Sequence, residues 1–224
     1  MSIKKRLIAR LDIKGNRLIK GVRFEGVKVI GDPSEIIEDY LEKGIDELFY
    51  SDAVASLYGR NSLGEILKEA SKKCFVPITA GGGIRSVEDG RRLLAAGADK
   101  LAINTAAVKE PELLNQLSKR FGSQCVVLSV QARRSTNQTS GWEIMIESGR
   151  EKTSLDLKDW IVKAVSFGVG EIFLTSVDQD GTQNGPDNNL IELYNSSLSD
   201  SEPIDTNTLH LSITLKPVAL NAFK

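Results

Sequence analysis

Gly44-Ile45-Asp46-Glu47-Leu48-Phe49 recurs in the second half of this 224-residue chain as Gly168-Val169-Gly170-Glu171-Ile172-Phe173. At nearly the same spacing, Leu11-Asp12-Ile13-Lys14 corresponds to Val130-Gln131-Ala132-Arg133. Repetition over such a distance indicates that one set of structural units is used twice. It favours a β/α barrel built from two halves over an open, doubly wound sheet.

Around these repeats, short apolar runs alternate with segments of helical periodicity. The runs are apolar over most of their length, which is typical of strands buried on both faces of a parallel sheet. The expected strands are residues 7–13, 47–51, 76–80, 100–103, 125–130 and 171–176. The expected helices are residues 33–43, 63–73, 87–96, 111–121, 155–167 and 188–194. Units of this length predict an α/β fold with right-handed crossovers between parallel strands.

The repeat breaks down after about residue 194. The segment that should repeat residues 77–83 is residues 203–208, which contain no glycine. We therefore expect a TIM-type (β/α)8 barrel in which about six units are recognisable, with an incomplete barrel domain over residues 1–194. Residues 195–224 are expected to form a divergent polar tail that need not be ordered. As an alternative for part of this tail, residues 209–215 pair with the open sheet edge.

Composition narrows the class of protein. Hydrophobic residues make up 41% of the chain, charged residues 26%, and the net charge is −1. These values are ordinary for a globular domain and argue against a nucleic-acid-binding protein, which normally has a basic excess. Cys74 and Cys125 lack metal or redox spacing, so we expect reduced, buried thiols. A lone histidine, His210, gives no support for a metal site, and we expect a cytoplasmic protein with no membrane partner.

Candidate phosphate-binding residues follow two neighbouring expected strands. Gly81-Gly82-Gly83-Ile84 comes after the third strand, and Asn104-Thr105 comes after the fourth. Glycines allow backbone N–H groups to approach a ligand closely, and the Asn and Thr side chains add donors. Two adjacent strand ends that supply donors to one point are typical of a phosphate site in a β/α barrel. The alternative is a tight glycine turn followed by an ordinary helix cap at Thr105.

Four charged residues stand at the beginnings of expected strands. These residues are Arg6, Glu47, Lys100 and Glu171. In a barrel the strand beginnings converge on one face, so two positive and two negative side chains should form a ring there. One reading is an ion-pair network that stabilises the closed end of the barrel.

Several motifs span six expected strand ends in one order: Leu11-Asp12-Ile13-Lys14, Gly81-Gly82-Gly83-Ile84, Ile103-Asn104-Thr105-Ala106-Ala107, Phe121-Gly122-Ser123-Gln124 and residues 174–182. In these motifs, residues 1 to about 194 resemble the cyclase subunit of imidazole glycerol phosphate synthase, a β/α-barrel family of histidine biosynthesis. The resemblance implies a lyase that works with a glutaminase subunit in a heterodimer and needs no cofactor. Glutamine-derived ammonia would cross the barrel and react with a phosphoribulosyl aminoimidazole carboxamide intermediate. The products would be imidazole glycerol phosphate and an aminoimidazole carboxamide ribotide.

The resemblance also implies roles for individual residues at the top of the barrel. Asp12 would be a general acid or base, and Lys20 would order the substrate from a mobile loop. The phosphate-binding residues would be Gly82, Gly83, Asn104 and Thr105. Asp178, Asp180 and Thr182 would line the same rim, where they contact the substrate or order Asp12. Structural alternatives stay open: an ion pair of Asp12 with Lys14 or Lys20, a solvated charge at Lys20, and an Asx turn before Gly181.

At the opposite face, the same resemblance implies an ammonia gate. The ring of Arg6, Glu47, Lys100 and Glu171 has the family's charge pattern, and alternating signs keep every member ionised and paired. Asp99, beside Lys100, would face the glutaminase. A related histidine-pathway sugar isomerase shares the phosphate sites but does not need such a ring, so it fits less well.

Two features depart from the family. Gln131 stands where the family has a second catalytic aspartate, and a neutral amide cannot exchange a proton. Arg10 replaces a small residue, which places a cation that could bind a different anionic group near the site. The family's second phosphate site, after strands seven and eight, is not recognisable. Three hypotheses therefore remain: a cyclase, a paralogue that passes ammonia to a nucleotide sugar in surface-polysaccharide amidation, and a non-catalytic glutaminase-docking partner or inactive truncated product.

Overall fold

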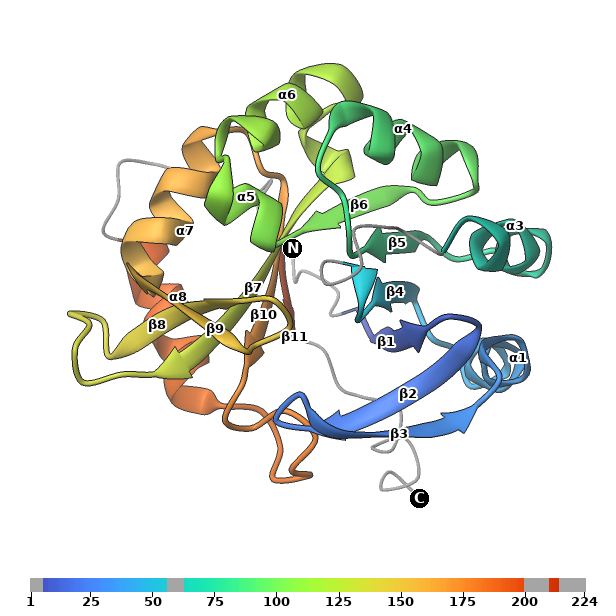
Figure 1. The fold of residues 1–224 in the computed structure, drawn as a ribbon, viewed down its shortest axis with the longest axis horizontal. Helices are drawn as coiled ribbons and strands as arrows, with labels where there is room; N and C mark the ends of the chain where they lie inside the picture. The colour runs from blue at the N-terminus through green and yellow to red at the C-terminus, as the bar shows by residue number, and fades with distance from the viewer. Residues whose placement is uncertain (1–5, 56–62, 200–209, 214–224) are drawn as a thin grey trace, which may run out of the picture.

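Seven parallel strands form the centre of the molecule (Figure 1). The computed structural model describes residues 6–55, 63–199 and 210–213. Across the sheet the strands follow the chain order β1, β4, β5, β6, β7, β10 and β11 without a reversal. An open doubly wound sheet would reverse its order at a switch point, so this order is that of the β/α-barrel family. The bounds are Ile8–Lys14 (β1), Glu47–Asp52 (β4), Ile78–Gly81 (β5), Lys100–Ile103 (β6), Val126–Arg134 (β7), Glu171–Ser176 (β10) and His210–Ile213 (β11).

Helices surround the strands on the outside, as Figure 1 shows. They are α1 (Pro33–Glu42), α3 (Leu63–Lys73), α4 (Val87–Ala95), α5 (Thr105–Lys109), α6 (Glu112–Phe121), α7 (Leu157–Ser166) and α8 (Asn188–Ser199), with a short 3-10 helix, η1 (Ser123–Cys125). Three helices begin at a side chain that accepts a backbone N–H of the first turn: Asp32 at α1, Ser86 at α4 and Asp156 at α7. Such caps satisfy donors that have no partner inside the helix.

All six strands and six helices expected from the sequence are present, most of them with shifted ends. The largest change among the strands is in β7, which continues to Arg134 instead of ending at residue 130. The extension arises because β8 (Trp142–Ile146) pairs antiparallel with the last residues of β7. The composition of β7 alone does not reveal that another strand pairs with its end.

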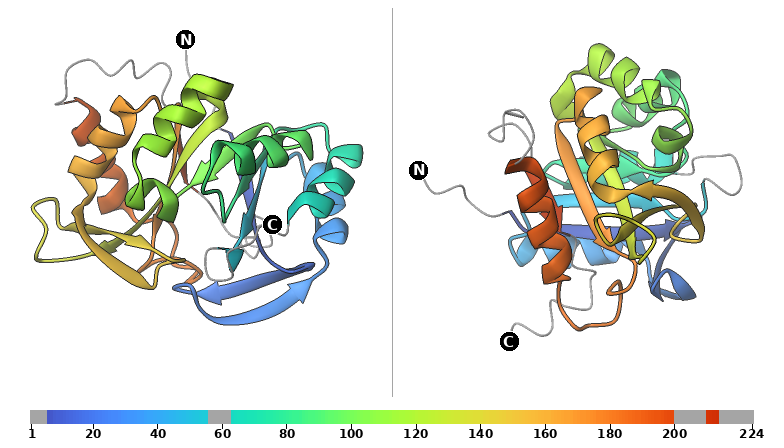
Figure 2. Two further views of the ribbon diagram at one scale, coloured as in Figure 1. Left: turned by 45° about the horizontal axis from the view of Figure 1, so that its top comes forward. Right: turned by 90° about the vertical axis from the view of Figure 1, so that its left-hand side faces the viewer.

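Two antiparallel hairpins were not expected. One consists of β2 (Arg17–Val22) and β3 (Glu25–Gly31) and pairs with β1, whereas the other consists of β8 and β9 (Glu151–Asp156). Both lie at the same end of the barrel, beyond the carboxyl ends of the parallel strands (Figure 2). The expectation that Lys20 lies in a mobile loop is wrong, because Lys20 belongs to β2 and is in register with Lys28 of β3.

Side chains of the parallel strands alternate between two apolar clusters, as the two-residue period of a strand requires. On β1, Ala9 and Leu11 pack in the large cluster between strands and helices, whereas Ile8 lies in a smaller one. The other members of this inner cluster are Phe49, Ala102, Val127 and Phe173. The rings of Phe49 and Phe173 stack with their centroids 4.6 Å apart. The inner cluster therefore fills a layer of the barrel bore.

The predicted tail is described only in part. Residues 195–199 continue α8, residues 210–213 form β11, and residues 200–209 and 214–224 lie outside the described residues. β11 pairs parallel with β10, with Glu171 opposite His210, so the alternative of edge pairing is the one that the structure shows. Among the described strands, no pairing joins β11 to β1.

Two other expectations concern the cysteines and membranes. Cys74 and Cys125 are free thiols that are half-buried instead of fully buried. Burial raises the pKa of both thiols, so both stay protonated at neutral pH. Within the described part of the chain, no helix is both long and apolar enough to cross a membrane.

Candidate active site

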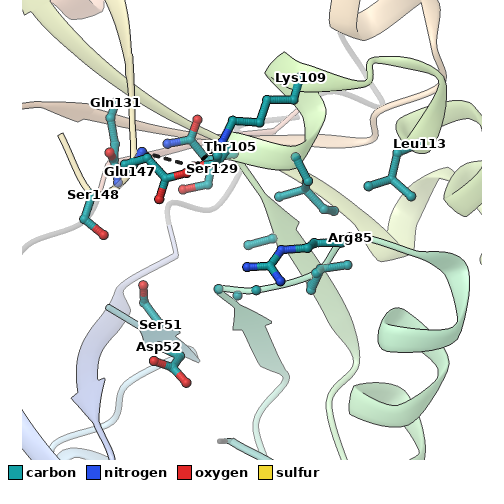
Figure 3. Close-up of a pocket in the computed structure, with 18 of the residues that line it drawn as sticks. Ser51, Asp52, Arg85, Thr105, Lys109, Leu113, Ser129, Gln131, Glu147 and Ser148 are labelled. Carbon is teal, nitrogen blue, oxygen red and sulfur yellow. Dashed lines mark hydrogen bonds and ion pairs between the residues drawn. The ribbon is translucent and has the colours of Figure 1, made fainter. Parts of the chain in front are cut away.

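A cavity of about 390 Å³ opens at the carboxyl ends of β4, β5, β6 and β7 (Figure 3). The expected phosphate-binding residues Gly82, Gly83, Asn104 and Thr105 all line it. Gly82 has φ +98°, and a Cβ atom there would lie 2.4 Å from the carbonyl oxygen of Asp52. A glycine is therefore required at this position both by its backbone conformation and by the close approach of β4.

The side chains of Asn104 and Thr105 in this cavity also contact the end of β8 and the turn that follows it. Asn104 Nδ2 donates to the carbonyl oxygen of Met145 at 3.2 Å, and the N–H of Glu147 donates to Thr105 Oγ1 at 3.0 Å. An amide nitrogen has a second hydrogen and a hydroxyl can still donate. Each side chain therefore keeps donor capacity for a ligand, although the turn covers both.

Glu147 brings a carboxylate to the same cavity, which the sequence did not suggest. Its oxygen Oε1 lies 3.0 Å from Lys109 Nζ, and the residue is 7% exposed. Glu147 and Ser148 have φ values of +49° and +57°, so the turn folds sharply back over the cavity. The Ser148-Gly149 pair is a recognisable turn signal. Nothing in the local sequence indicates that this turn reaches the end of β6.

Gln131 lies on β7, faces the same cavity and is 6% exposed. Its Oε1 atom is buried and has no hydrogen-bond partner among the described residues. Buried polar atoms in folded proteins are nearly always hydrogen-bonded to protein or water. An acceptor in a cavity wall with no protein partner is therefore suited to accept a hydrogen bond from a ligand.

Asp12 lies in a smaller cavity of about 80 Å³ that adjoins the first, since Ser51 and Ser148 line both. Arg10 Nε donates to Asp12 Oδ1 at 2.9 Å, and both residues are buried. The sequence had suggested Lys14 or Lys20 as the ion-pair partner of Asp12, whereas the structure adds Arg10. Lys14 lines this cavity, but Lys20 lines neither of the two.

The residues after β10 contact their own loop, the end of β7 and the β2–β3 turn. The N–H of Arg134 donates to Asp178 Oδ2 at 2.9 Å, and Thr182 Oγ1 donates to the carbonyl oxygen of Gln179 at 2.8 Å. The N–H of Arg23 donates to the carbonyl oxygen of Asp180, which ties the loop to the β2–β3 turn. None of Asp178, Asp180 and Thr182 lines either cavity described above.

At the opposite end of the bore, the four expected charges meet. Arg6 contacts Glu47 at 2.9 Å and Glu171 at 3.0 Å, and Lys100 Nζ lies 2.7 Å from each of the same two carboxylates. Both glutamate side chains are almost completely buried. The ring is therefore closed, with each cation bridging two anions.

Comparison with known proteins agrees with this geometry. The family model described as "Histidine biosynthesis protein" matches residues 6–201. The chain belongs to this histidine biosynthesis family.

Relatives within the histidine biosynthesis family narrow the assignment further. The chain is 55% identical over 194 residues to the imidazole glycerol phosphate synthase subunit HisF of Legionella pneumophila. The aligned region covers 87% of this chain and 91% of that protein. It is 45% identical over 203 residues to HisF of Corynebacterium glutamicum (strain R), covering 89% and 79%. It is 44% identical over 197 residues to HisF of Lactococcus lactis subsp. cremoris, covering 88% and 76%. The resemblance to the cyclase subunits is thereby confirmed, and the chain is a HisF homologue.

Several exposed side chains lie near the beginnings of the parallel strands, at the end of the barrel that carries the charged ring. Asp99 is exposed, and its Oδ2 accepts the N–H of Ile78 at 2.8 Å. Phe75, which precedes β5, is 96% exposed, and Leu7, which precedes β1, is 42% exposed. Asp99 was predicted from the sequence to face a partner, whereas Phe75 and Leu7 were not, although Phe75 is a large aromatic residue shortly before a strand.

Proposed function

We propose that this HisF homologue acts as the cyclase subunit of imidazole glycerol phosphate synthase in histidine biosynthesis. In this proposal it joins glutamine-derived ammonia to a phosphoribulosyl aminoimidazole carboxamide intermediate. The products are imidazole glycerol phosphate and an aminoimidazole carboxamide ribotide. The observation that carries the proposal is one bore with the charged ring at one end and Asp12 with the glycine-lined cavity at the other.

We call the carboxyl ends of the parallel strands the upper end of the barrel and the end with the charged ring the lower end. The chemistry of the upper end supports proton transfer by Asp12. Ammonia addition and ring closure both require protons to move at neutral pH, and a carboxylate at a strand end can accept and return them. Gln131 has no titratable proton, so it is proposed to accept a hydrogen bond from the substrate through its leftover Oε1. Lys109 and Arg85, which line the larger cavity, suit a phosphorylated substrate.

The lower end supports a route for ammonia and a docking face for a glutaminase. A ring of paired charges excludes bulk water and ions while its lysine can shift between two carboxylates. Phe75 and Leu7 supply apolar surface next to this ring, and Asp99 supplies a charge. Exposed aromatic residues beside polar groups are typical of protein interfaces. We propose that the glutaminase covers this face and that the complex is cytoplasmic.

The test is turnover of the ribulosyl aminoimidazole substrate by the purified chain with excess ammonium. We expect the wild type to form imidazole glycerol phosphate, and we expect Asp12→Asn to lose about 10²- to 10⁴-fold in kcat. Asp159→Asn, an exposed change on α7, serves as the control and should keep the wild-type kcat. A folded wild-type chain without turnover would contradict the proposal.

A second candidate is a paralogue that passes ammonia to a nucleotide sugar in surface-polysaccharide amidation. Gln131 on β7 favours it, because a neutral amide stands where the resemblance to the cyclases implies a second catalytic aspartate. In the ammonium assay, absence of turnover together with binding of a nucleotide sugar would support this second candidate.

A further inference from the structure

Arg10 is the residue of the bore that neither the motifs nor the proposed reaction explain. Ile8, Arg10 and Asp12 alternate with Ala9 and Leu11, so the first three share the inner face of β1. In the register with β4, Arg10 is level with Phe49 and Asp12 is level with Ser51. The guanidinium therefore lies between the apolar layer of the bore and the carboxylate at its upper end.

The guanidinium is enclosed on several sides. Nε donates to Asp12 Oδ1 at 2.9 Å, and Nη1 donates to Thr175 Oγ1 of β10 at 3.3 Å. Its carbon Cζ lies 5.4 Å from the ring centroid of Phe49 and 5.6 Å from that of Phe24. The residue is 3% exposed. Aromatic faces and a carboxylate both favour a cation, which explains how the charge is tolerated at this depth.

This enclosure argues against Arg10 as a binding group for an anion of the substrate. An anion would have to displace Asp12 or a ring, whereas the existing contact already orients one oxygen of Asp12. We propose that Arg10 is a positioning residue that keeps Asp12 ionised and fixes its Oδ1, so that Asp12 works as the base of the reaction. The role of Asp12 as the base rests on the proposed function. The effect of Arg10 on the charge and orientation of Asp12 does not.

Arg10 also compensates for the loss of a second carboxylate. Two neighbouring carboxylates divide acid and base roles because one of them is forced to hold a proton. Gln131 on β7 cannot form such a pair with Asp12, and the cation at Arg10 commits Asp12 to the ionised form instead. Asp12 then accepts the proton that the ammonia nitrogen loses after its bond to the substrate carbon has formed.

The other charges around Asp12 do not replace Arg10. Lys14 of β1 and Arg150 of the β8–β9 turn line the same small cavity, and both are exposed. Asp52 of β4 and Glu147 of the β8–β9 turn line the adjoining cavity with negative charge. Lys20 of β2 lines neither cavity, and Asp178 and Asp180 belong to the loop after β10. A buried, hydrogen-bonded cation acts on Asp12 more strongly than exposed charges, which water and salt screen.

The first experiment compares Arg10→Met and Arg10→Lys with the wild type. It measures kcat/KM for the ribulosyl aminoimidazole substrate against pH at a constant concentration of NH₃ instead of total ammonium. We expect the acidic limb of the profile to move to higher pH by about one to three units in Arg10→Met, with a smaller shift in Arg10→Lys. Arg17→Met is the matched control, because Arg17 is exposed on β2 and should leave the profile in place. An unshifted limb in a folded Arg10→Met would overturn the inference.

The second experiment does not depend on turnover. The carboxyl carbon of Asp12, in protein labelled with ¹³C-aspartate and assigned by its absence in Asp12→Asn, is titrated in wild type and Arg10→Lys. We expect the wild-type midpoint below about 3.9, the ordinary value for aspartate, and a higher midpoint in Arg10→Lys. A wild-type midpoint at or above the ordinary value would overturn the inference even if Arg10→Met fails to fold. Absence of turnover with a low midpoint would instead refute the proposed function and leave the role of Arg10 intact.

Discussion

At the scale of single residues, Glu147 adds a negative charge to the wall of the larger cavity. Its carboxylate lies in the wall of the cavity with Thr105 and Lys109, where a bound phosphate would meet its negative charge. Charge repulsion at short range in a partly buried site costs several kcal/mol. The Lys109 ion pair offsets part of this cost only while Lys109 stays with Glu147.

We therefore predict that Glu147→Gln strengthens binding of inorganic phosphate, used as a probe, by about tenfold, since 1.4 kcal/mol corresponds to a factor of ten. The substitution keeps the shape of the side chain, removes its charge and releases Lys109. Titration calorimetry on the purified chain measures the affinity. Glu110→Gln is the matched control, because Glu110 lines the same cavity but is exposed. Equal phosphate affinity in Glu147→Gln and wild type would refute this role of Glu147.

Also at the residue scale, burial separates two ion pairs of similar length. Lys100 Nζ lies 2.7 Å from Glu47 and its side chain is 13% exposed, whereas Lys72 Nζ lies 2.6 Å from Glu69 and is 66% exposed. Removing one partner of a buried pair leaves an uncompensated charge, whereas water solvates the remaining partner of an exposed pair.

Lys100→Met should lower the free energy of unfolding by about 3 to 5 kcal/mol, because Arg6 is then the cation of the ring that remains to compensate both Glu47 and Glu171. Lys72→Met should change it by less than about 1 kcal/mol. Urea denaturation of both variants gives the comparison. Similar losses in the two variants would mean that the ring is solvated in solution.

At the scale of elements, Asp156 joins the β8–β9 hairpin to α7. Its side chain accepts the N–H of Lys158 at 2.8 Å as the helix cap and the N–H of Ser140 at 2.7 Å from the segment before β8. Burial raises the pKa of Asp156, but the hydrogen bonds from Ser140 and the first turn of α7 outweigh it, so the pKa lies below the ordinary 3.8. One carboxylate thus fixes both the start of the helix and the hairpin beside the site.

Asp156→Ala should therefore destabilise the protein by about 1 to 2 kcal/mol at neutral pH. Because the folded-state pKa is lowered, this contribution is present above the unfolded-state value and disappears as the pH falls through the folded-state value. The difference between wild type and Asp156→Ala in thermal or urea unfolding should be constant from about pH 5 to 7 and should shrink as the pH falls below the ordinary 3.8. Asp159→Ala, an exposed change in the same helical turn, should show a smaller and less pH-dependent difference.

At the scale of the whole molecule, the two ends of the barrel differ in what they expose. The end at the carboxyl ends of the parallel strands carries the two hairpins (Figure 2). The opposite end carries the charged ring, and Phe75 and Leu7, which precede β5 and β1, are exposed. A 96% exposed phenylalanine contributes almost nothing to the stability of the isolated chain. It gains energy only when a partner buries it.

Phe75→Ser should accordingly leave unfolding and ammonium-dependent turnover unchanged while weakening glutaminase binding by at least about tenfold. Analytical ultracentrifugation or calorimetry with the purified glutaminase measures the affinity. Val29→Ser, at an exposed position of β3 on the hairpin at the upper end, should leave binding intact. Unchanged binding in Phe75→Ser would place the docking face elsewhere.

The β/α alternation, the strand beginnings that carry the ring and the strand ends that carry Asp12, the glycines and Asn104 were all predictable. These features follow from local apolar periodicity and from the rule that parallel strands bring like ends together. The hairpins were not predictable, because their residues resemble polar loops until a neighbouring strand pairs with them. The pairing of β11 was only one of two alternatives for the same reason, because it depends on the edge of β10 and not on the composition of β11.

By itself, then, the sequence determined the fold class, the family and the order of chemical groups along the bore. Only the tertiary structure decided that Glu147 covers Thr105, that Arg10 holds Asp12 and that Gln131 keeps a leftover acceptor. The physical reason is the distance along the chain between the residues that interact. Periodicity and strand order can be recognised from neighbouring residues, whereas these contacts depend on packing, burial and charge among residues that meet only in the folded barrel.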